Sequence, residues 1–214
     1  MKRILLLLLV FCLLLGGCSL PVKEEEKQYT ATFLDLFDTV TTIIGFAESQ
    51  EEFDRISGEV LAELGEYHRL FTIYHRFEGL ENLCTINNDL QNGEHRTVKV
   101  DEKVIDMLSY AKEMHTLTGG MTNIAMGSVL SIWHDYRTAG IDNPSKAELP
   151  PMELLKEAAL HTDINNLIID EENSTVYIAD PKMTLDVGAV AKGYAVEMVA
   201  RYLQEMGKTI LSLL

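Results

Sequence analysis

The sequence predicts an α+β fold in which helices pack on a mixed or antiparallel sheet. Residues 30–46 are rich in Thr, Val, Ile and Phe, which favour extended strands. Later segments carry apolar residues at steps of three and four, which is typical of helices with one buried face. Two short apolar runs flank the turn Glu171–Ser174 and indicate a hairpin of antiparallel strands. The order of the strands stays open at this level.

Length, composition and charge limit the classes of protein that are possible. The chain has 214 residues, which corresponds to one domain or two small ones. The hydrophobic fraction of 47% and the charged fraction of 24% argue against a disordered chain. The formal net charge of −15 makes nucleic acid an unfavourable partner, because both surfaces are negative. A phosphate-bearing cofactor remains possible where a metal or a helix N-terminus contacts the phosphates.

The N-terminal segment has the features of a secretory signal peptide. Two basic residues precede an unbroken apolar run over 4–15, which is shorter than the ~20 residues of a spanning helix. The alternative is a buried apolar helix, which the extreme N-terminal position and the lack of a polar face disfavour. Leu15-Gly16-Gly17-Cys18 resembles a bacterial lipobox, in which the cysteine is lipidated.

We therefore divide the chain into a signal peptide over 1–17, a lipidated Cys18 with a tether over 18–29, and a folded domain over 30–214. This division predicts an extracytoplasmic protein that is anchored by lipid to a bacterial membrane. Cys84 is then the remaining cysteine, so the mature chain forms no internal disulfide, and we expect Cys84 to be a small buried hydrophobe.

Residues 30–46 are expected to form two strands, or one bent strand, with a break near Asp38. Ser49 and Glu52 have the spacing of a capping box and predict the start of a long helix. Its apolar residues recur on one face: Phe53, Ile56, Val60, Leu64, Tyr67 and Phe71. Asp101 caps a second helix, which ends before Gly119 and Gly120.

The remaining elements follow the same patterns of periodicity and turn residues. They are expected as a helix over 123–137, a helix from 151 to about 159, strands over 166–170, 175–179 and 183–187, a helix over 189–206 and a strand over 208–214.

The junction between the expected strand over 183–187 and the helix that follows is the most suggestive local unit for binding chemistry. The strand ends in Asp186, Gly188 permits a sharp turn, and Lys192 lies one turn into the helix. The first amides of a helix attract anions, and the lysine could reach the same ligand. The alternative is an ordinary strand–helix junction with a solvated lysine, which a single glycine turn does not exclude.

Other conspicuous side chains are expected to be structural. Trp133 is expected to anchor the core. Five histidines show no ligand spacing and are expected to be exposed or hydrogen-bonded: His68, His75, His95, His115 and His161. Four methionines are expected in the core: Met107, Met114, Met121 and Met126.

Four segments, taken together and in this order, resemble the ApbE-type flavin transferases, the FAD:protein FMN transferases. They are Leu36-Phe37-Asp38-Thr39-Val40; Phe71-Thr72-Ile73-Tyr74 with Glu78-Gly79-Leu80-Glu81-Asn82-Leu83 and Ile86-Asn87; Thr118-Gly119-Gly120 with Asn123-Ile124-Ala125-Met126-Gly127 and Trp133; and Leu185-Asp186-Val187-Gly188-Ala189-Val190-Ala191-Lys192-Gly193-Tyr194-Ala195.

The resemblance implies an extracytoplasmic, metal-dependent enzyme that uses FAD and usually Mg²⁺. Such an enzyme transfers FMN to a Thr or Ser hydroxyl of a target flavoprotein and releases AMP. By motif position, the implied FAD contacts are Phe37 and Tyr74 along the flavin or adenine, Met121, Thr122 and Asn123 along the nucleotide, and Asp186 and Lys192. The main-chain oxygen of Ala189 is the implied metal ligand, and no catalytic residue is assigned.

Two departures from the family pattern are visible. Asn123 stands where the family often has an Asp. The family also continues past Leu214 with a glycine-rich strand and further metal ligands. We therefore expect this chain to be the N-terminal portion of a transferase and to be weakly active or inactive on its own.

Two other hypotheses stay open: a lipid-anchored protein that binds a flavin or another solute without catalysis, and a non-functional gene fragment.

Overall fold

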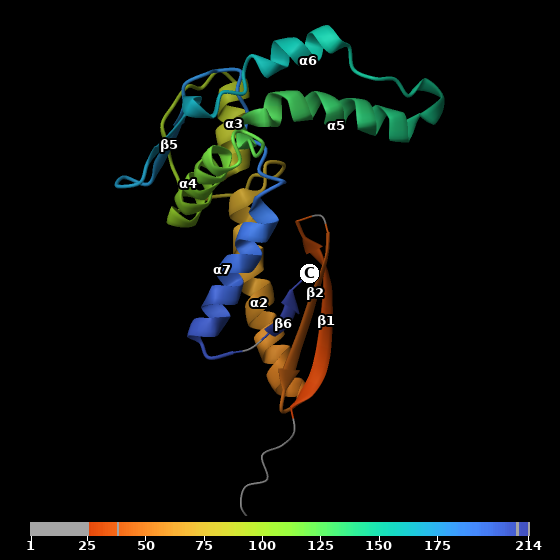
Figure 1. Ribbon diagram of the computed structural model, residues 1–214, viewed down its shortest axis with the longest axis vertical. Helices are drawn as coiled ribbons and strands as arrows, with labels where there is room; N and C mark the ends of the chain where they lie inside the picture. Colours follow the sequence, from red (N-terminus) through yellow and green to blue (C-terminus); the bar gives the residue numbers. More distant parts are fainter. Residues whose placement is uncertain (1–25, 38, 209, 214) are drawn as a thin grey trace, which may run out of the picture.

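The structure is a computed structural model that describes residues 26–37, 39–208 and 210–213 (Figure 1). The expected signal peptide and the lipidated Cys18 lie outside the described residues. The expected tether over 18–29 extends into them, and there the structure differs from the prediction. The first strand begins at Lys27, before the boundary at Thr30, because residues 27–29 pair with residues 45–47 of the next strand.

One long helix connects two small antiparallel sheets. Strands β1 (Lys27–Leu36), β2 (Thr39–Ala47) and β6 (Ile210–Leu213) form the first sheet in the order β1-β2-β6. Helix α2 (Gln50–Phe71) packs on β1 and β2, and α7 (Ala191–Glu205) lies along α2 (Figure 1). The expected α+β class with antiparallel pairing is confirmed.

The second sheet lies at the other end of α2. Strands β3 (Val98–Lys99), β5 (Thr175–Ile178) and β4 (Leu167–Asp170) pair in that order, and α3 (Leu83–Gln91) and α4 (Glu102–Leu117) lie beside them. The predicted hairpin around Glu171–Ser174 is confirmed as the β4–β5 pair.

Two helices form an arm that extends from this end (Figure 1). After the 3-10 turn Ile124–Met126, α5 (Gly127–Asp142) runs outward, and α6 (Met152–Ala159) returns along it. Short 3-10 turns at Pro144–Lys146 and Ile164–Asn166 flank α6. Helix α5 runs past the predicted end at residue 137. No residue of α6 is buried.

The predicted helix starts are confirmed for α2 and α4, and the predicted buried face is confirmed for α2. The Oγ of Ser49 accepts the Glu52 amide at 3.2 Å, and the Asp101 carboxylate accepts the Lys103 amide at 2.9 Å. The six apolar residues predicted for the face of α2 are all buried. Gly119 and Gly120 follow α4 with positive φ, as helix-terminating glycines do.

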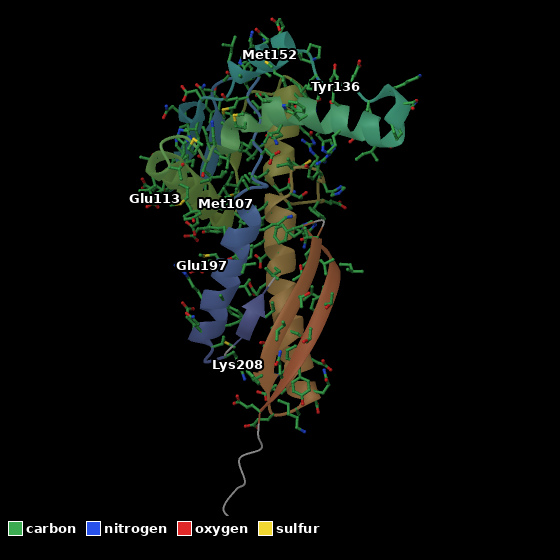
Figure 2. All side chains as sticks on the ribbon, turned by 45° about the vertical axis from the view of Figure 1, so that its right-hand side comes forward. Met107, Glu113, Tyr136, Met152, Glu197 and Lys208 are labelled. Atoms are coloured by element: carbon green, nitrogen blue, oxygen red, sulfur yellow. The ribbon has the colours of Figure 1, made fainter. Side chains whose placement is uncertain are left out.

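Helix α3 was not among the predicted elements. Its signal is a capping box without an acidic residue, in which Asn82 accepts the Thr85 amide at 3.0 Å and the Thr85 hydroxyl lies 3.5 Å from the Asn82 amide. Of the four methionines expected in the core, Met107 is buried there. Met114 and Met126 are half-buried outside the core cluster and Met121 is 88% exposed, so the core assignment is wrong for these three. Figure 2 labels Met107, which belongs to α4.

The predicted strand over 183–187 is wrong, because this segment pairs with no strand in the described part of the chain. It is extended, and three different partners satisfy its backbone. The side chain of buried Asn87 donates to the Leu185 carbonyl and accepts the Leu185 amide, both at 2.9 Å. Gly127 donates to the Thr184 carbonyl at 3.1 Å, and Asp186 donates to the Ile124 carbonyl at 2.8 Å. We call residues 184–188 the site segment.

Glycine is required where the arm meets the site segment. A Cβ on Gly127 would lie 2.6 Å from the Thr184 carbonyl oxygen, a distance that side chains do not tolerate. The start of α5 is thereby held directly on the site segment.

Among the described residues, no helix combines the length and the apolar character needed to cross a bilayer.

We expect Asn87→Ala to destabilise the fold by about 2–3 kcal/mol, because it leaves the amide and carbonyl of Leu185 without partners in a buried place. Urea unfolding measures this loss. The neighbouring Asn88→Ala is the matched control, since the side-chain amide of Asn88 bonds only to the Cys84 sulfur among the described residues. Equal unfolding midpoints for the two variants would contradict the role of Asn87.

Candidate functional site

Two adjoining hollows lie where the β1–β2 hairpin tip, the loop after α2 and the site segment meet. The smaller hollow is lined by residues from several elements: Phe37 at the hairpin tip, His68 in α2, Tyr74 in the loop, Asp186 in the site segment and Lys192 in α7. Four of the seven FAD contacts implied by the family resemblance are therefore brought together: Phe37, Tyr74, Asp186 and Lys192.

The larger hollow is a groove of about 800 Å³ between α5, α3 and the site segment. It shares Tyr74 and Asp186 with the smaller hollow, so the two hollows adjoin, and we call them together the depression. Aromatic side chains from α5 line it, including Trp133 and Tyr136, the second of which Figure 2 labels on the arm. Two adjoining hollows with aromatic side chains in their walls suit an elongated ligand that carries flat rings.

Trp133 was expected in the core, and this expectation is wrong. Its side chain is 43% exposed and lines the groove. The adjacent His134 ring lies 6.1 Å from the Tyr74 ring, centroid to centroid, at an interplanar angle of 34°. Helix α5 stands away from the sheets, so its aromatic residues face the groove instead of a core.

The turn between the site segment and α7 presents amides and a cation. Val190 and Ala191 both donate to the Val187 carbonyl, and α7 begins at Ala191, later than predicted. Within the described part of the chain, the Lys192 and Gly193 amides have no backbone acceptor, and the exposed Lys192 amine makes no ion pair. Uncapped amides at a helix start, together with a lysine, favour an anion.

Asp186 stabilises this turn. Its carboxylate accepts the Gly188 amide at 2.9 Å, and the side chain is half-buried beside both hollows.

Tyr194 anchors the first turn of α7 in the core against Phe71 and Tyr110. Burial, reinforced by the nearby Asp106 charge, raises the pKa of Tyr194 to about 12, so its phenol stays protonated near neutral pH.

The hairpin tip has an unusual backbone. Phe37 has φ 53°, a left-handed conformation that bulky residues rarely adopt. Its amide donates to Nδ1 of His68 at 3.1 Å, and the two rings meet edge to face at 5.3 Å.

The structure does not bring the other three implied contacts to the hollows. Met121 is exposed, and Thr122 and Asn123 are half-buried outside the lining of both hollows. Asn123 caps the turn before α5, accepting the Ala125 amide and donating to the Thr162 carbonyl, both at 2.9 Å. The Thr122 carbonyl contacts Nδ1 of His115 at 2.9 Å.

The implied metal ligand Ala189 lies in the exposed turn before α7. Within the part of the chain that the structure describes, no cluster of three His, Cys, Asp or Glu side chains could hold a metal ion. Asp186, the carboxylate that lines both hollows, already accepts the Gly188 amide. These residues do not fit a Mg²⁺ site of their own, because Mg²⁺ requires near-octahedral oxygen coordination.

The sequence assigned no site role to two residues that shape the site, His68 and Asn87, although Asn87 lies in the second family motif. Neither role could be found from a local pattern, because each residue acts on a segment far away in the chain.

The expectation of hydrogen-bonded histidines is confirmed for His68, for His115 and for His161, whose Nδ1 lies 2.8 Å from the Asp180 carboxylate. Cys84 is buried as expected, and this burial raises the pKa of its thiol.

Curated relatives match most of this chain. It is 30% identical over 205 residues to an FAD:protein FMN transferase of Treponema pallidum, covering 90% of this chain and 51% of that protein. It is 25% identical over 206 residues to one of Vibrio cholerae, covering 94% and 55%. The chain thus spans about half the length of these relatives.

Solved structures share the fold. The ApbE protein from Thermotoga maritima superposes with a TM-score of 0.64 at 22% identity, covering 83% of this chain and 53% of that one. The flavin transferase ApbE from Vibrio cholerae gives the same TM-score at 18% identity, covering 88% and 56%. The ApbE family model matches residues 37–211, which include nearly all of the four motifs and both hollows. The chain therefore belongs to the ApbE family.

Proposed function

We propose that this chain carries the FAD-binding part of an FAD:protein FMN transferase, which moves FMN from FAD to a Thr or Ser hydroxyl of a target flavoprotein and releases AMP. The observation that carries this proposal is the convergence of Phe37, Tyr74, Asp186 and Lys192 on one depression. Its relatives are named for this activity, and the chain spans about half of their length.

The anionic centre of FAD is its diphosphate, and the start of α7 is the place that suits it. The Lys192 amine and the amides of Lys192 and Gly193, which have no backbone acceptor among the residues that the structure describes, supply positive charge in an otherwise acidic chain. The aromatic residues of the two hollows, Phe37 and Tyr74 in one and Trp133 in the other, suit the ring systems at the two ends of FAD. The ligand would then lie across the site segment.

In the proposed reaction, the acceptor hydroxyl oxygen bonds to the phosphorus of the FMN half. The bond from that phosphorus to the bridging oxygen breaks, and AMP leaves with that oxygen and its electron pair. The hydroxyl proton passes to solvent or to the departing phosphate. Negative charge develops on the phosphate oxygens, where Lys192 and the α7 amides can stabilise it.

The proposal includes Mg²⁺, with the Ala189 carbonyl as one oxygen ligand. A divalent cation bound to a diphosphate neutralises phosphate charge and orients the groups for attack. The described residues form no metal cluster of their own, so we assign the steps above to protein groups alone. The proposal also keeps the lipid anchor at Cys18 and the extracytoplasmic location, which rest on the N-terminal sequence.

FAD should quench the fluorescence of Trp133, because this is the single tryptophan of the sequence and it lines the groove. We expect Lys192→Ala to weaken FAD binding about tenfold, which corresponds to the loss of one hydrogen bond to a charged group. Lys99→Ala removes an equal charge from β3, outside both hollows, and should leave the affinity unchanged. Equal affinities for the two variants would contradict the placement of the diphosphate.

Transfer itself is tested by incubating the chain, in excess over FAD, with Mg²⁺ and an acceptor protein that carries the target Thr. Because the chain is expected to be at most weakly active alone, we expect AMP to appear slowly, in a one-to-one ratio with flavin that stays on the acceptor after denaturation. Such single-turnover conditions reveal even a slow reaction. FAD binding without AMP would instead support a flavin-binding protein without catalysis.

A further inference from the structure

The tip of the β1–β2 hairpin adopts a conformation that its sequence does not favour. Leu36 pairs with Thr39 at this tip, and tight hairpin turns favour a positive φ at the first residue after the strand. Glycine or asparagine normally adopts this conformation, whereas here Phe37 has φ 53°. For a residue with a Cβ, the left-handed conformation is unfavourable, because the Cβ approaches the following carbonyl oxygen. Some contact must therefore offset this cost.

His68 supplies that contact. The Phe37 amide donates to Nδ1 of His68 at 3.1 Å, and the two rings pack edge to face. A backbone amide can only donate, so Nδ1 carries no proton, and the neutral imidazole has its proton on Nε2. His68 itself lies in the last turn of α2, which packs against β1, β2 and α7 and provides a rigid support.

The contact matters for the site because Phe37 and His68 both line the smaller hollow, together with Asp186 and Lys192. Strained backbone conformations that persist are often found where a side chain must be held for function. If the Phe37 amide lost its acceptor, the Phe37 backbone would sample other conformations, and the Phe37 ring would leave the wall of the hollow.

We propose that His68 is a positioning residue for the flavin nucleotide: by accepting the Phe37 amide at Nδ1, it holds the Phe37 ring in the wall of the FAD-binding hollow. The inference rests on the proposed function for the identity of the ligand. It assigns His68 a role that acts through Phe37 and requires no contact between the imidazole and FAD.

Two substitutions separate the hydrogen bond from the ring contact. His68→Asn places an amide oxygen near the position of Nδ1 and keeps an acceptor without the ring. His68→Phe keeps an aromatic edge and removes the acceptor. We expect FAD affinity within about twofold of the original for His68→Asn and a loss of about tenfold for His68→Phe, the equivalent of one hydrogen bond. Equal affinities in both variants would overturn the proposal.

A measurement without FAD keeps the inference independent of the ligand. In the absence of FAD, exchange of the Phe37 amide hydrogen should be slow in the original chain and in His68→Asn, and fast in His68→Phe. Nitrogen NMR of the original chain should show His68 protonated at Nε2 and not at Nδ1. Fast Phe37 exchange in the original chain, or a proton on Nδ1, would overturn the positioning role.

The two readouts distinguish the failure of this inference from failure of the proposed function. If the original chain binds no FAD, the proposed function is wrong, and so is the assignment of a flavin nucleotide as the ligand of this hollow. The exchange data then decide alone whether His68 positions Phe37. Urea unfolding of both variants serves as the control, since midpoints close to that of the original chain exclude a general loss of the fold.

Discussion

The hydrogen bonds between Asn87 and the backbone of Leu185 are the constraint on which the rest of the site depends. A buried extended segment must satisfy its amides and carbonyls, and a neighbouring strand normally does so. Here the site segment has no strand partner among the described residues, and a side-chain amide takes that place. Gly127 and Ile124 fix the adjoining residues, so the groove, the turn at Gly188 and the start of α7 are held together.

This arrangement explains how an acidic chain can offer a place for an anion. The net charge of −15 is spread over the whole sequence, whereas the start of α7 presents amides and one lysine at a single point. Short-range contacts with these groups outweigh the negative charges that lie farther away, because salt screens interactions beyond about 10 Å. The Asp186 carboxylate, which lies beside this point, accepts the Gly188 amide. The aromatic residues then supply contact area on either side of this point.

Much of the fold could be predicted from the sequence, because its signals are local. The capping residues Ser49 and Asp101 and the apolar faces of α2 and α4 depend on neighbours in the chain. The family motifs likewise pointed to four residues that the fold brings to one depression.

The errors have a different cause, because they concern contacts between distant parts of the chain. The segment over 183–187 has the composition of a strand, yet its partner is the side chain of Asn87, nearly a hundred residues away. Trp133 was assigned to the core by residue type, whereas α5 leaves the sheets and exposes it. His68 acts on Phe37 across the hairpin, which no spacing rule reveals.

The depression around the site segment is proposed to hold FAD with its diphosphate at the start of α7, and a crystal structure of the chain with FAD tests this placement most directly. We expect phosphate oxygens within hydrogen-bond distance of the Lys192 and Gly193 amides, and a ring of the ligand against Phe37 or Tyr74. A diphosphate bound elsewhere, with the α7 amides facing only solvent, would contradict it.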